Sequence, residues 1–333
     1  MRPTLYWLHD ILASLAGSEV DAPLPAYFVL LLSGFVLAVI VAAMTARKIG
    51  EDPDVMIDLG LAMLLAGVVG SRILHVLADG YFWDYVHLCT DPSKVDWHVT
   101  QGECASPAWG GVWDAAKGVC HPPPSALSDR LFSVSRGCWT WAAFWAGGLT
   151  YYGGFLGAVP IGWYLLKRDR FSFWKAADLG GFTISMGLVW GRMGCLLAGC
   201  CFGVVSKSGV ALVFPPGSAA SEWQEKHGLL ASRAMPSLPV LPMQIFEAVA
   251  SLAICTFCGL YLWPRKRYDG QVFVAFLGLY SLARFVLEIW RSDDRGGTLG
   301  MSTSQLIGVA LVGAAVWVHR WRTRPLAISA PAA

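Results

Sequence analysis

Charged and amide side chains occur within stretches of this sequence that are otherwise almost entirely apolar. They are Arg72 with His75, Arg192, Gln244 with Glu247, and Arg284 with Glu288. Residues three or four apart share one face of a helix, so the paired members would project together. An ionisable group inside an apolar membrane helix is costly and by default marks a functional site.

Three of these residues are arginines, which suggests an anion site. The planar guanidinium of arginine binds phosphate through two parallel hydrogen bonds. We therefore expect Arg72, Arg192 and Arg284 to form a positively charged pocket for a phospholipid headgroup. The alternative is that Arg284–Glu288 and Arg192–Glu247 are ion pairs that hold helices together, as polar pairs do in membranes.

The composition places the chain in a membrane. Of its 333 residues, 55% are hydrophobic and only 14% are charged, whereas soluble domains carry about 25% charged residues. The net charge of +2 and the lack of a basic stripe argue against nucleic acid as a partner. Residues 1–17 are interrupted by His9 and Asp10, which favours an interfacial segment over a cleaved signal peptide.

Seven apolar segments are long enough to cross a bilayer, which takes roughly 20 residues. They are 26–46, 57–78, 141–166, 178–201, 242–263, 271–290 and 302–319. None alternates at period two as a barrel strand would, so we expect helices. The fold class is therefore an all-α polytopic membrane protein of one domain, residues 1–333.

The basic residues between the segments predict the orientation. Lys and Arg are enriched in cytoplasmic loops, and here they follow segments one, three, five and seven as Arg47–Lys48, Lys167 to Lys175, Arg265–Arg267 and Arg320–Arg324. The N-terminus is then outside and the C-terminus inside. The connection 291–300, in which Arg291 and Arg295 accompany Asp293 and Asp294, is outside. In this orientation the buried arginines lie in the outer halves of their helices.

Two long connections would lie outside the membrane, 79–140 and 203–241. The first holds Cys89, Cys104, Cys120 and Cys138. An even number of cysteines in an exported segment predicts two disulfides, with three pairings possible. A zinc site with His87, His98 and His121 is the rival interpretation, weakened because the segment has no CxxC pair. We expect this segment to form a folded cap.

Glycines cluster in the third and fourth segments. They are Gly147, Gly148, Gly153, Gly154 and Gly157, and Gly191, Gly194, Gly199 and Gly203. Close helix packing through small residues explains most of them. Some could instead let a lipid approach the backbone, and the sequence leaves both interpretations open.

Six motifs, in order from about residue 27 to 319, resemble those of the bacterial prolipoprotein diacylglyceryl transferases. They are GSRILHV (70–76), YGGFLG (152–157), GRMGCLLAGCCFG (191–203), LPMQIFEA (241–248), LYSLARFVLEIWRSDD (279–294) and GMSTSQL (300–306). Members of this family move the diacylglyceryl group of phosphatidylglycerol onto the lipobox cysteine of a prolipoprotein. The resemblance implies this activity at the outer leaflet of the bacterial inner membrane, with no cofactor.

The resemblance also implies roles for residues. Arg192 and Arg284 would contact the phosphate. The residues that would shape the substrate site are Arg72, Gly153, Gly154, Gly203, Gln244, Glu247, Tyr280, Glu288 and Arg291.

Three positions depart from the family pattern. Tyr152 replaces the histidine that activates the thiol, while Cys195 and Cys200 replace an asparagine and a glutamate. A phenol with an ordinary pKa near 10 is a poor base at neutral pH, so His75 is the candidate for a relocated base, or else a packing histidine.

Alternatively, the chain is a divergent paralogue that binds phospholipid but has lost or changed the transferase chemistry. Cys195, Cys200 and Cys201 could then do disulfide, acyl-carrier or metal chemistry. The helical phase of these cysteines argues against a metal site, and packing is the commonest role of a buried cysteine. We expect packing for Cys255 and Cys258 as well.

Overall fold

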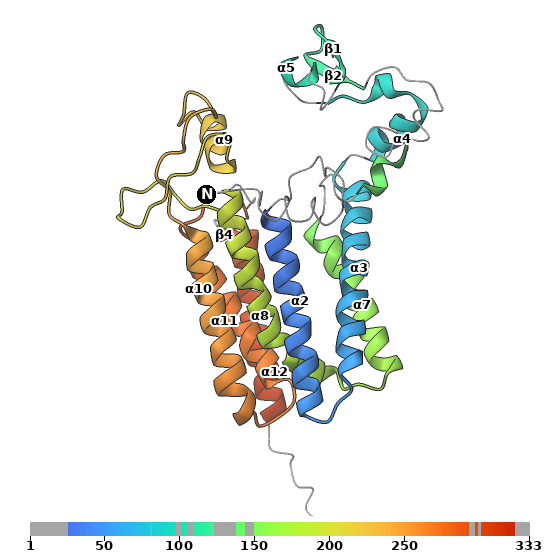
Figure 1. Cartoon of the computed structure of the whole chain (residues 1–333), viewed down its shortest axis with the longest axis vertical. Coiled ribbons are helices and arrows are strands. Elements are labelled where there is room, and N and C mark those ends of the chain that lie inside the picture. Colours follow the sequence, from blue (N-terminus) through green and yellow to red (C-terminus); the bar gives the residue numbers. More distant parts are fainter. Residues whose placement is uncertain are drawn as a thin grey trace, which may run out of the picture. The chain divides into compact units, whose positions relative to one another are not determined.

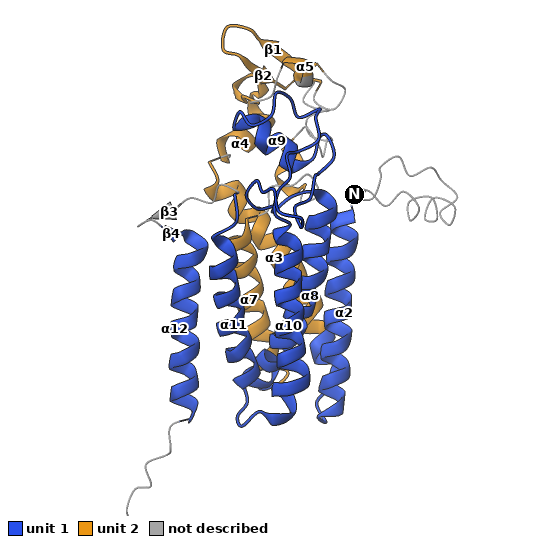
Figure 2. Ribbon diagram, turned by 90° about the vertical axis from the view of Figure 1, so that its left-hand side faces the viewer, with its two compact units in different colours: residues 1–57, 171–333 blue, residues 58–170 orange. Residues whose placement is uncertain are grey.

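A computed structural model of the chain describes residues 26–80, 82–97, 101–105, 110–122, 138–143, 150–292, 297–298 and 301–323. The described part is mostly helical and divides into two compact units. Unit 1 comprises residues 1–57 and 171–333, and unit 2 comprises residues 58–170 (Figure 2). That the whole chain forms one domain stays a prediction.

Unit 1 contains long helices that run side by side (Figure 1). They are α2 (Ala26–Lys48), α8 (Phe173–Ala198), α10 (Met243–Thr256), α11 (Gln271–Glu288) and α12 (Thr303–Thr323). Helix α8 packs against α2, α10 and α11, and α12 packs against α11. Helix α10 continues through the π-helical η4 (Phe257–Leu262) and the short η5 (Trp263–Arg265). The short strands β3 (Gly297–Thr298) and β4 (Met301–Ser302) pair before α12.

Small residues on α8 allow its neighbours to approach closely. A Cβ atom on Gly194 would lie 3.1 Å from the Tyr27 ring, and one on Gly181 would lie 3.1 Å from the Phe273 backbone. Such contacts leave no room for a larger side chain. The packing interpretation of the α8 glycines is therefore supported at Gly194.

A buried carboxylate fixes one end of the α8–α11 pair. Asp178 is fully buried and accepts hydrogen bonds from the backbone N–H groups of Gly270 and Val272, at 2.9 and 2.8 Å. Lys266 also donates to it, at 2.8 Å. The carboxylate thereby satisfies the first N–H groups of α11. Arg192 lies about 21 Å further along α8, so the arginine site is built at the other end.

Unit 2 contains most of α3 (Pro53–Ala78) and α7 (Tyr151–Arg168). Between them lie α4 (Phe82–Thr90), η1 (Pro92–Lys94), α5 (Gln101–Cys104), the antiparallel strands β1 (Val112–Asp114) and β2 (Val119–His121), and η2 (Cys138–Ala142). Glycines allow α3 and α7 to pack closely. A Cβ on Gly70 would come within 3.0 Å of Gly157 Cα, and a Cβ on Gly154 would come within 2.7 Å of Ser71 Oγ. Gly147 and Gly148 lie outside the described residues.

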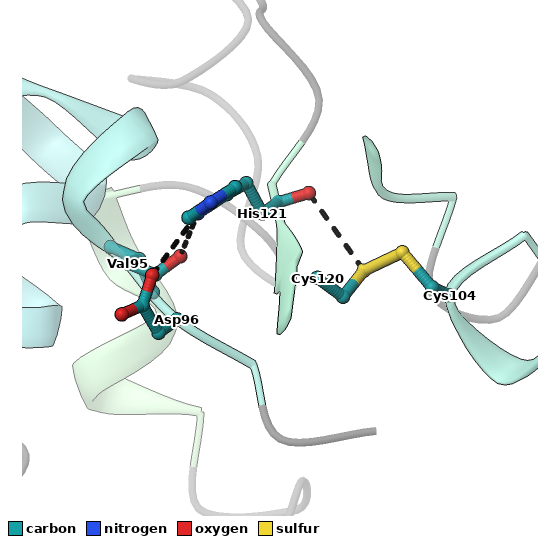
Figure 3. The surroundings of a disulfide bond; sticks show 5 residues. All are labelled: Val95, Asp96, Cys104, Cys120 and His121. Atoms are coloured by element: carbon teal, nitrogen blue, oxygen red, sulfur yellow. Dashed lines mark hydrogen bonds and ion pairs between the residues drawn. A yellow bond between two sulfur atoms is a disulfide. The ribbon is translucent and has the colours of Figure 1, made fainter. Parts of the chain in front are cut away.

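Two disulfides join the four cysteines of the connection, as expected. They are Cys89–Cys138 and Cys104–Cys120, which selects one of the three possible pairings. His121 Nδ1 lies 2.9 Å from the carbonyl oxygen of Val95 and 3.3 Å from Asp96 (Figure 3). His121 thus contributes to local structure beside the Cys104–Cys120 disulfide.

Among the residues that the structure describes, five helices are long and apolar enough to cross a membrane: Ala26–Lys48, Pro53–Ala78, Phe173–Ala198, Met243–Arg265 and Gln271–Glu288. They coincide with five of the seven expected segments and confirm a polytopic, mostly helical membrane protein. Helices α7 and α12 fall on the other two segments. The expected start of the third segment at 141 differs from the structure, where residues 138–142 form η2 and α7 begins only after the extended residue Thr150.

Candidate functional site

The Glu247 carboxylate forms ion pairs with three arginines from different parts of unit 1. Its Oε2 lies 2.6 Å from Nη2 of Arg192 on α8. Its Oε1 accepts hydrogen bonds from Nη1 of Arg284 on α11 at 2.7 Å and from Nη1 of Arg291 at 2.6 Å. Glu288 adds a second carboxylate, 2.7 Å from Arg284. We call these five residues the arginine cluster.

The arginine cluster carries three positive and two negative formal charges, which leaves one positive charge. The Glu247 and Glu288 side chains are only 6% and 5% exposed, so the charges interact where water screens them weakly. Arg192 is the most exposed arginine, at 17%, compared with 10% for Arg284 and 2% for Arg291. An anion would therefore reach Arg192 first.

The ion-pair interpretation of the arginines is confirmed, whereas the anion pocket stays a prediction. The expected pairs Arg192–Glu247 and Arg284–Glu288 are present. Arg291, which the resemblance places at the site, binds Glu247 there. Asp293, Asp294 and Arg295 lie outside the described residues.

Gln244 lies one helical turn before Glu247 and is fully buried. Its Nε2 donates a hydrogen bond of 2.6 Å to the carbonyl oxygen of Cys200. Its Oε1 is buried and finds no hydrogen-bond partner in the described part of the chain. Because an unsatisfied buried acceptor is costly, this atom is suited to accept a hydrogen bond from a bound hydroxyl group.

The segment after α8 folds over this end of the helices. Phe202, Phe214, Ala220 and Val240 form a small buried core, and α9 (Ala219–Lys226) belongs to the same segment. Gly203 lies where a Cβ would come within 2.7 Å of both Met243 Cγ and the Trp290 carbonyl oxygen. The glycine that ends the GRMGCLLAGCCFG motif is thus required by packing.

Other side chains complete the surroundings of the arginine cluster. Ser302 Oγ donates a hydrogen bond of 3.0 Å to Glu288. The Tyr280 ring stacks on Phe276, with centroids 5.7 Å apart, and Tyr280 interacts electrostatically with Arg192. Tyr280 therefore lies close to Arg192, and its role in the substrate site stays a prediction.

Three thiols also converge at this end of α8. The sulfur atoms of Cys195, Cys200 and Cys201 all lie within 4.8 Å of one another. The prediction from helical phase that these cysteines lie apart is wrong, because the helix does not continue through residue 201. The helix ends at Ala198, Gly199 has a positive φ of 72°, and Cys201 has a φ of 61°. This turn brings the later thiols back toward Cys195.

Arg72 belongs to unit 2, where it binds backbone carbonyl groups. Its Nε donates to Trp141 O at 2.7 Å, and its Nη2 donates to Thr140 O at 2.6 Å. Its guanidinium also lies over the Tyr85 ring, 5.4 Å from the centroid. Arg72 thus anchors η2, and its role in an anion pocket stays a prediction.

His75 is part of a hydrogen-bonded group in unit 2. Its Nδ1 lies 2.8 Å from Asp79 Oδ2, which also accepts a hydrogen bond of 2.9 Å from Thr150. The hydrogen bond from His75, and then that from Thr150, holds the pKa of Asp79 below its ordinary value. Tyr152 is 52% exposed at the start of α7.

Sequence reasoning missed several of these contacts. Asp79 and Thr150 were not singled out, although Asp79 lies four residues after His75 and would share its helical face. The convergence of the thiols could have been anticipated from Gly199, because glycine commonly ends a helix. No motif or spacing in the sequence indicates the contact between Ser302 and Glu288.

Comparison with known proteins gives a consistent result. The family model described as prolipoprotein diacylglyceryl transferase matches residues 18–102 and 130–321. A phosphatidylglycerol–prolipoprotein diacylglyceryl transferase from Dehalococcoides mccartyi is 28% identical over 183 residues, which are 55% of this chain and 65% of the relative. One from Neisseria meningitidis is 32% identical, covering 50% of this chain and 62% of the relative. Transferase 2 of Clostridium perfringens is 30% identical, covering 50% and 59%.

The chain thus spans somewhat less than two thirds of the length of these curated relatives. Residues 103–129 fall between the two ranges that the family model matches. They carry Cys104, Cys120 and the β1–β2 hairpin. The hairpin and its disulfide therefore lie outside the residues that the family model matches.

Proposed function

The chain belongs to the prolipoprotein diacylglyceryl transferase family, and from this we propose that it transfers the diacylglyceryl group of phosphatidylglycerol to the lipobox cysteine of prolipoproteins. The relatives' names support both substrates. The proposed place of the reaction is the outer leaflet of the bacterial cytoplasmic membrane.

The observation that carries the proposal is the arginine cluster around Glu247. It brings together three guanidinium groups, whose charge is opposite to that of a phosphodiester. Arg192 and Arg284 are the proposed contacts to the phosphate, and Arg291 is a third cation close to them. Preorganised cations at a leaving phosphate stabilise the charge that develops as it departs.

The proposed step is a displacement at carbon. The thiolate sulfur of the lipobox cysteine forms a C–S bond with the glyceryl carbon that carries the phosphate. The C–O bond to the phosphate breaks, and glycerol phosphate leaves with the electron pair. The thiol proton passes to a base, for which His75 is the candidate. Because a free thiol is already a few per cent thiolate at pH 7, a strong base is not required.

The remaining site residues have proposed roles in binding substrate. Gln244 would accept a hydrogen bond from a headgroup hydroxyl through its unsatisfied Oε1. Glu247 and Glu288 would hold the arginines in place. The other residues proposed at the site are Arg72, Tyr152, Gly153, Gly154, Gly203 and Tyr280.

The proposed topology has seven spans, including α7 and α12, with the N-terminus outside and the C-terminus inside. It rests on the distribution of basic residues in the connections. In this arrangement the arginine cluster faces the outer leaflet. Segments 79–140 and 203–241 are then extracytoplasmic, and the disulfides Cys89–Cys138 and Cys104–Cys120 are consistent with an oxidising compartment.

A second function is favoured by the substituted residues. Tyr152 stands in place of the family's histidine, and Cys195 and Cys200 stand in place of two polar residues. A chain that keeps the cations and loses these groups could bind phospholipid without performing the transfer. This alternative predicts lipid binding that depends on Arg192, but no modified lipoprotein.

Complementation separates the two functions. The chain is expressed in a bacterium whose own transferase can be depleted, and lipoprotein modification is followed by mass spectrometry. Modified lipoprotein after depletion supports the transferase. Absence of modification, with the chain abundant in the membrane and still binding phosphatidylglycerol through Arg192, refutes the transferase and supports the second function.

A further inference from the structure

The turn that ends α8 places three thiols around one point. Cys195 lies in the last turn of the helix, and Cys200 and Cys201 follow Gly199. The three sulfur atoms lie within 4.8 Å of one another. The Cys200 thiol also donates a weak hydrogen bond to the carbonyl oxygen of Cys195, at 3.8 Å. The turn is therefore held back against the helix end.

We propose that Cys195, Cys200 and Cys201 bind one soft d10 cation, Zn(II) or Cu(I), through three thiolates. A zinc–sulfur bond is about 2.3 Å long, so three sulfurs around one ion are about 4.0 Å apart. Because no two of the sulfur atoms are more than 4.8 Å apart, small side-chain rotations suffice to bring them to this spacing. Thiolate ligands select these ions over hard cations such as Mg(II) and Ca(II).

Two cationic side chains lie beside the three thiols. Arg291 interacts directly with the Cys201 thiol, and Arg192 interacts electrostatically with Cys195 and Cys201. Three thiolates leave a negative charge after binding either ion, and these arginines offset it. Cys195 is 8% exposed, while Cys200 and Cys201 are partly exposed, so an ion can enter from one side.

Three protein ligands leave one coordination position open. Sites that hold a structural zinc ion supply four ligands, whereas sites with three protein ligands leave room for water or another ligand. In the described part of the chain, no fourth cysteine, histidine or carboxylate joins the group. The proposed site therefore presents an ion that can take an exogenous ligand.

The other free cysteines provide an internal comparison. Cys255 and Cys258 lie in α10 and η4 and form no such group in the described part of the chain. Cys258 is fully buried, and its thiol lies 4.0 Å from the carbonyl oxygen of Val272. They serve as matched controls because they share the chemistry of the three thiols but not their convergence.

Metal binding is measured on the full chain purified in detergent, without reference to transferase activity. The chain is treated with chelator and reductant, loaded with Zn(II) or with Cu(I) in separate arms, desalted, and its metal content is measured by mass spectrometry. We expect about one ion per chain in at least one arm. Cys195→Ser, Cys200→Ser and Cys201→Ser should each lower occupancy at least tenfold, whereas Cys255→Ser should not.

A second measurement needs no variant. Alkylation of the wild-type chain, followed by peptide mass spectrometry, should show Cys195, Cys200 and Cys201 protected by the bound ion and reactive after chelation. Cys255 and Cys258 should react equally in both conditions. The proposal is overturned if neither ion binds, if all three thiols react fully in excess metal, or if protein extracted with a thiol-blocking reagent contains a disulfide among them.

Discussion

The Glu247 carboxylate and the Arg192 guanidinium lie 2.6 Å apart and join α10 to α8. The same carboxylate binds Arg284 and Arg291, so one buried anion organises three cations. The Glu247 carboxylate therefore holds the three arginines at defined positions before any ligand binds. Preorganisation of this kind is what phosphate binding and charge stabilisation require.

Removing the negative charge of Glu247 should destabilise the protein. Glu247→Gln keeps the size of the side chain but leaves buried guanidinium groups uncompensated, which typically costs about 3–5 kcal/mol. We expect a clear fall in the melting temperature of the detergent-purified chain. Glu222→Gln is the control, because Glu222 and Arg233 form an exposed pair at 3.8 Å whose loss should change stability by about 0.5 kcal/mol or less. Equal melting temperatures for the two variants would contradict the stabilising role of the Glu247 carboxylate.

Both the planar shape and the charge of the Arg192 guanidinium should contribute to lipoprotein modification. Lysine keeps the charge but cannot form two parallel hydrogen bonds to phosphate. Arg192→Lys should therefore lower lipoprotein modification at least tenfold in the complementation assay, and Arg192→Ala should lower it further. Arg233→Lys, at an exposed position, should have no effect. Full activity of Arg192→Lys would show that a point charge suffices.

Much of this arrangement could be anticipated from the sequence, since apolar runs and charged residues inside them are local signals. The helix positions follow from these runs, and the pairs Arg192–Glu247 and Arg284–Glu288 follow from the cost of buried charge. The contact of Arg291 with Glu247 could not be anticipated, because it depends on how the chain turns after α11. Convergence of the thiols was missed because helical phase holds only while the helix continues, and α8 ends at Ala198.

Gly203 should tolerate no side chain. Gly203→Ala would place a Cβ within 2.7 Å of Met243 Cγ and the Trp290 carbonyl oxygen, and overpacking of this kind costs about 1–3 kcal/mol. The melting temperature should fall accordingly. Gly209→Ala is the matched control, because a Cβ at Gly209 would meet no atom within 4 Å. If both variants melt like the wild type, the segment after α8 is not held as described.

The disulfide between Cys104 and Cys120 should stabilise the hairpin locally. It closes a segment with a sequence separation of 16, for which the loss of chain entropy is worth about 3 kcal/mol. Cys104→Ser with Cys120→Ser should therefore increase proteolysis within residues 101–122, measured by peptide mapping. Cys255→Ser should leave that cleavage unchanged. Free thiols at both positions in the wild-type chain under non-reducing conditions would contradict the pairing.

The contact between His75 and Asp79 supplies a test of the relocated base. Asp79 Oδ2 lies 2.8 Å from His75 Nδ1, so it orients the imidazole ring. Because the pKa of Asp79 is lowered from its ordinary value of 3.8, the contact is fully favourable above that pH and is lost as the pH falls through the lower folded-state value. Asp79 is therefore ionised at the neutral pH of the assay.

We expect His75→Ala to lower the rate of lipoprotein modification about 100-fold or more, the usual contribution of a general base. Asp79→Asn should lower it less, because the ring remains but loses its orienting charge. Asp91→Asn is the matched control: Asp91 is also an exposed carboxylate whose pKa is lowered, first by a hydrogen bond from Ser93, but it has no contact with His75. A wild-type rate in His75→Ala would assign His75 to packing and leave thiol activation to the substrate's own thiolate fraction.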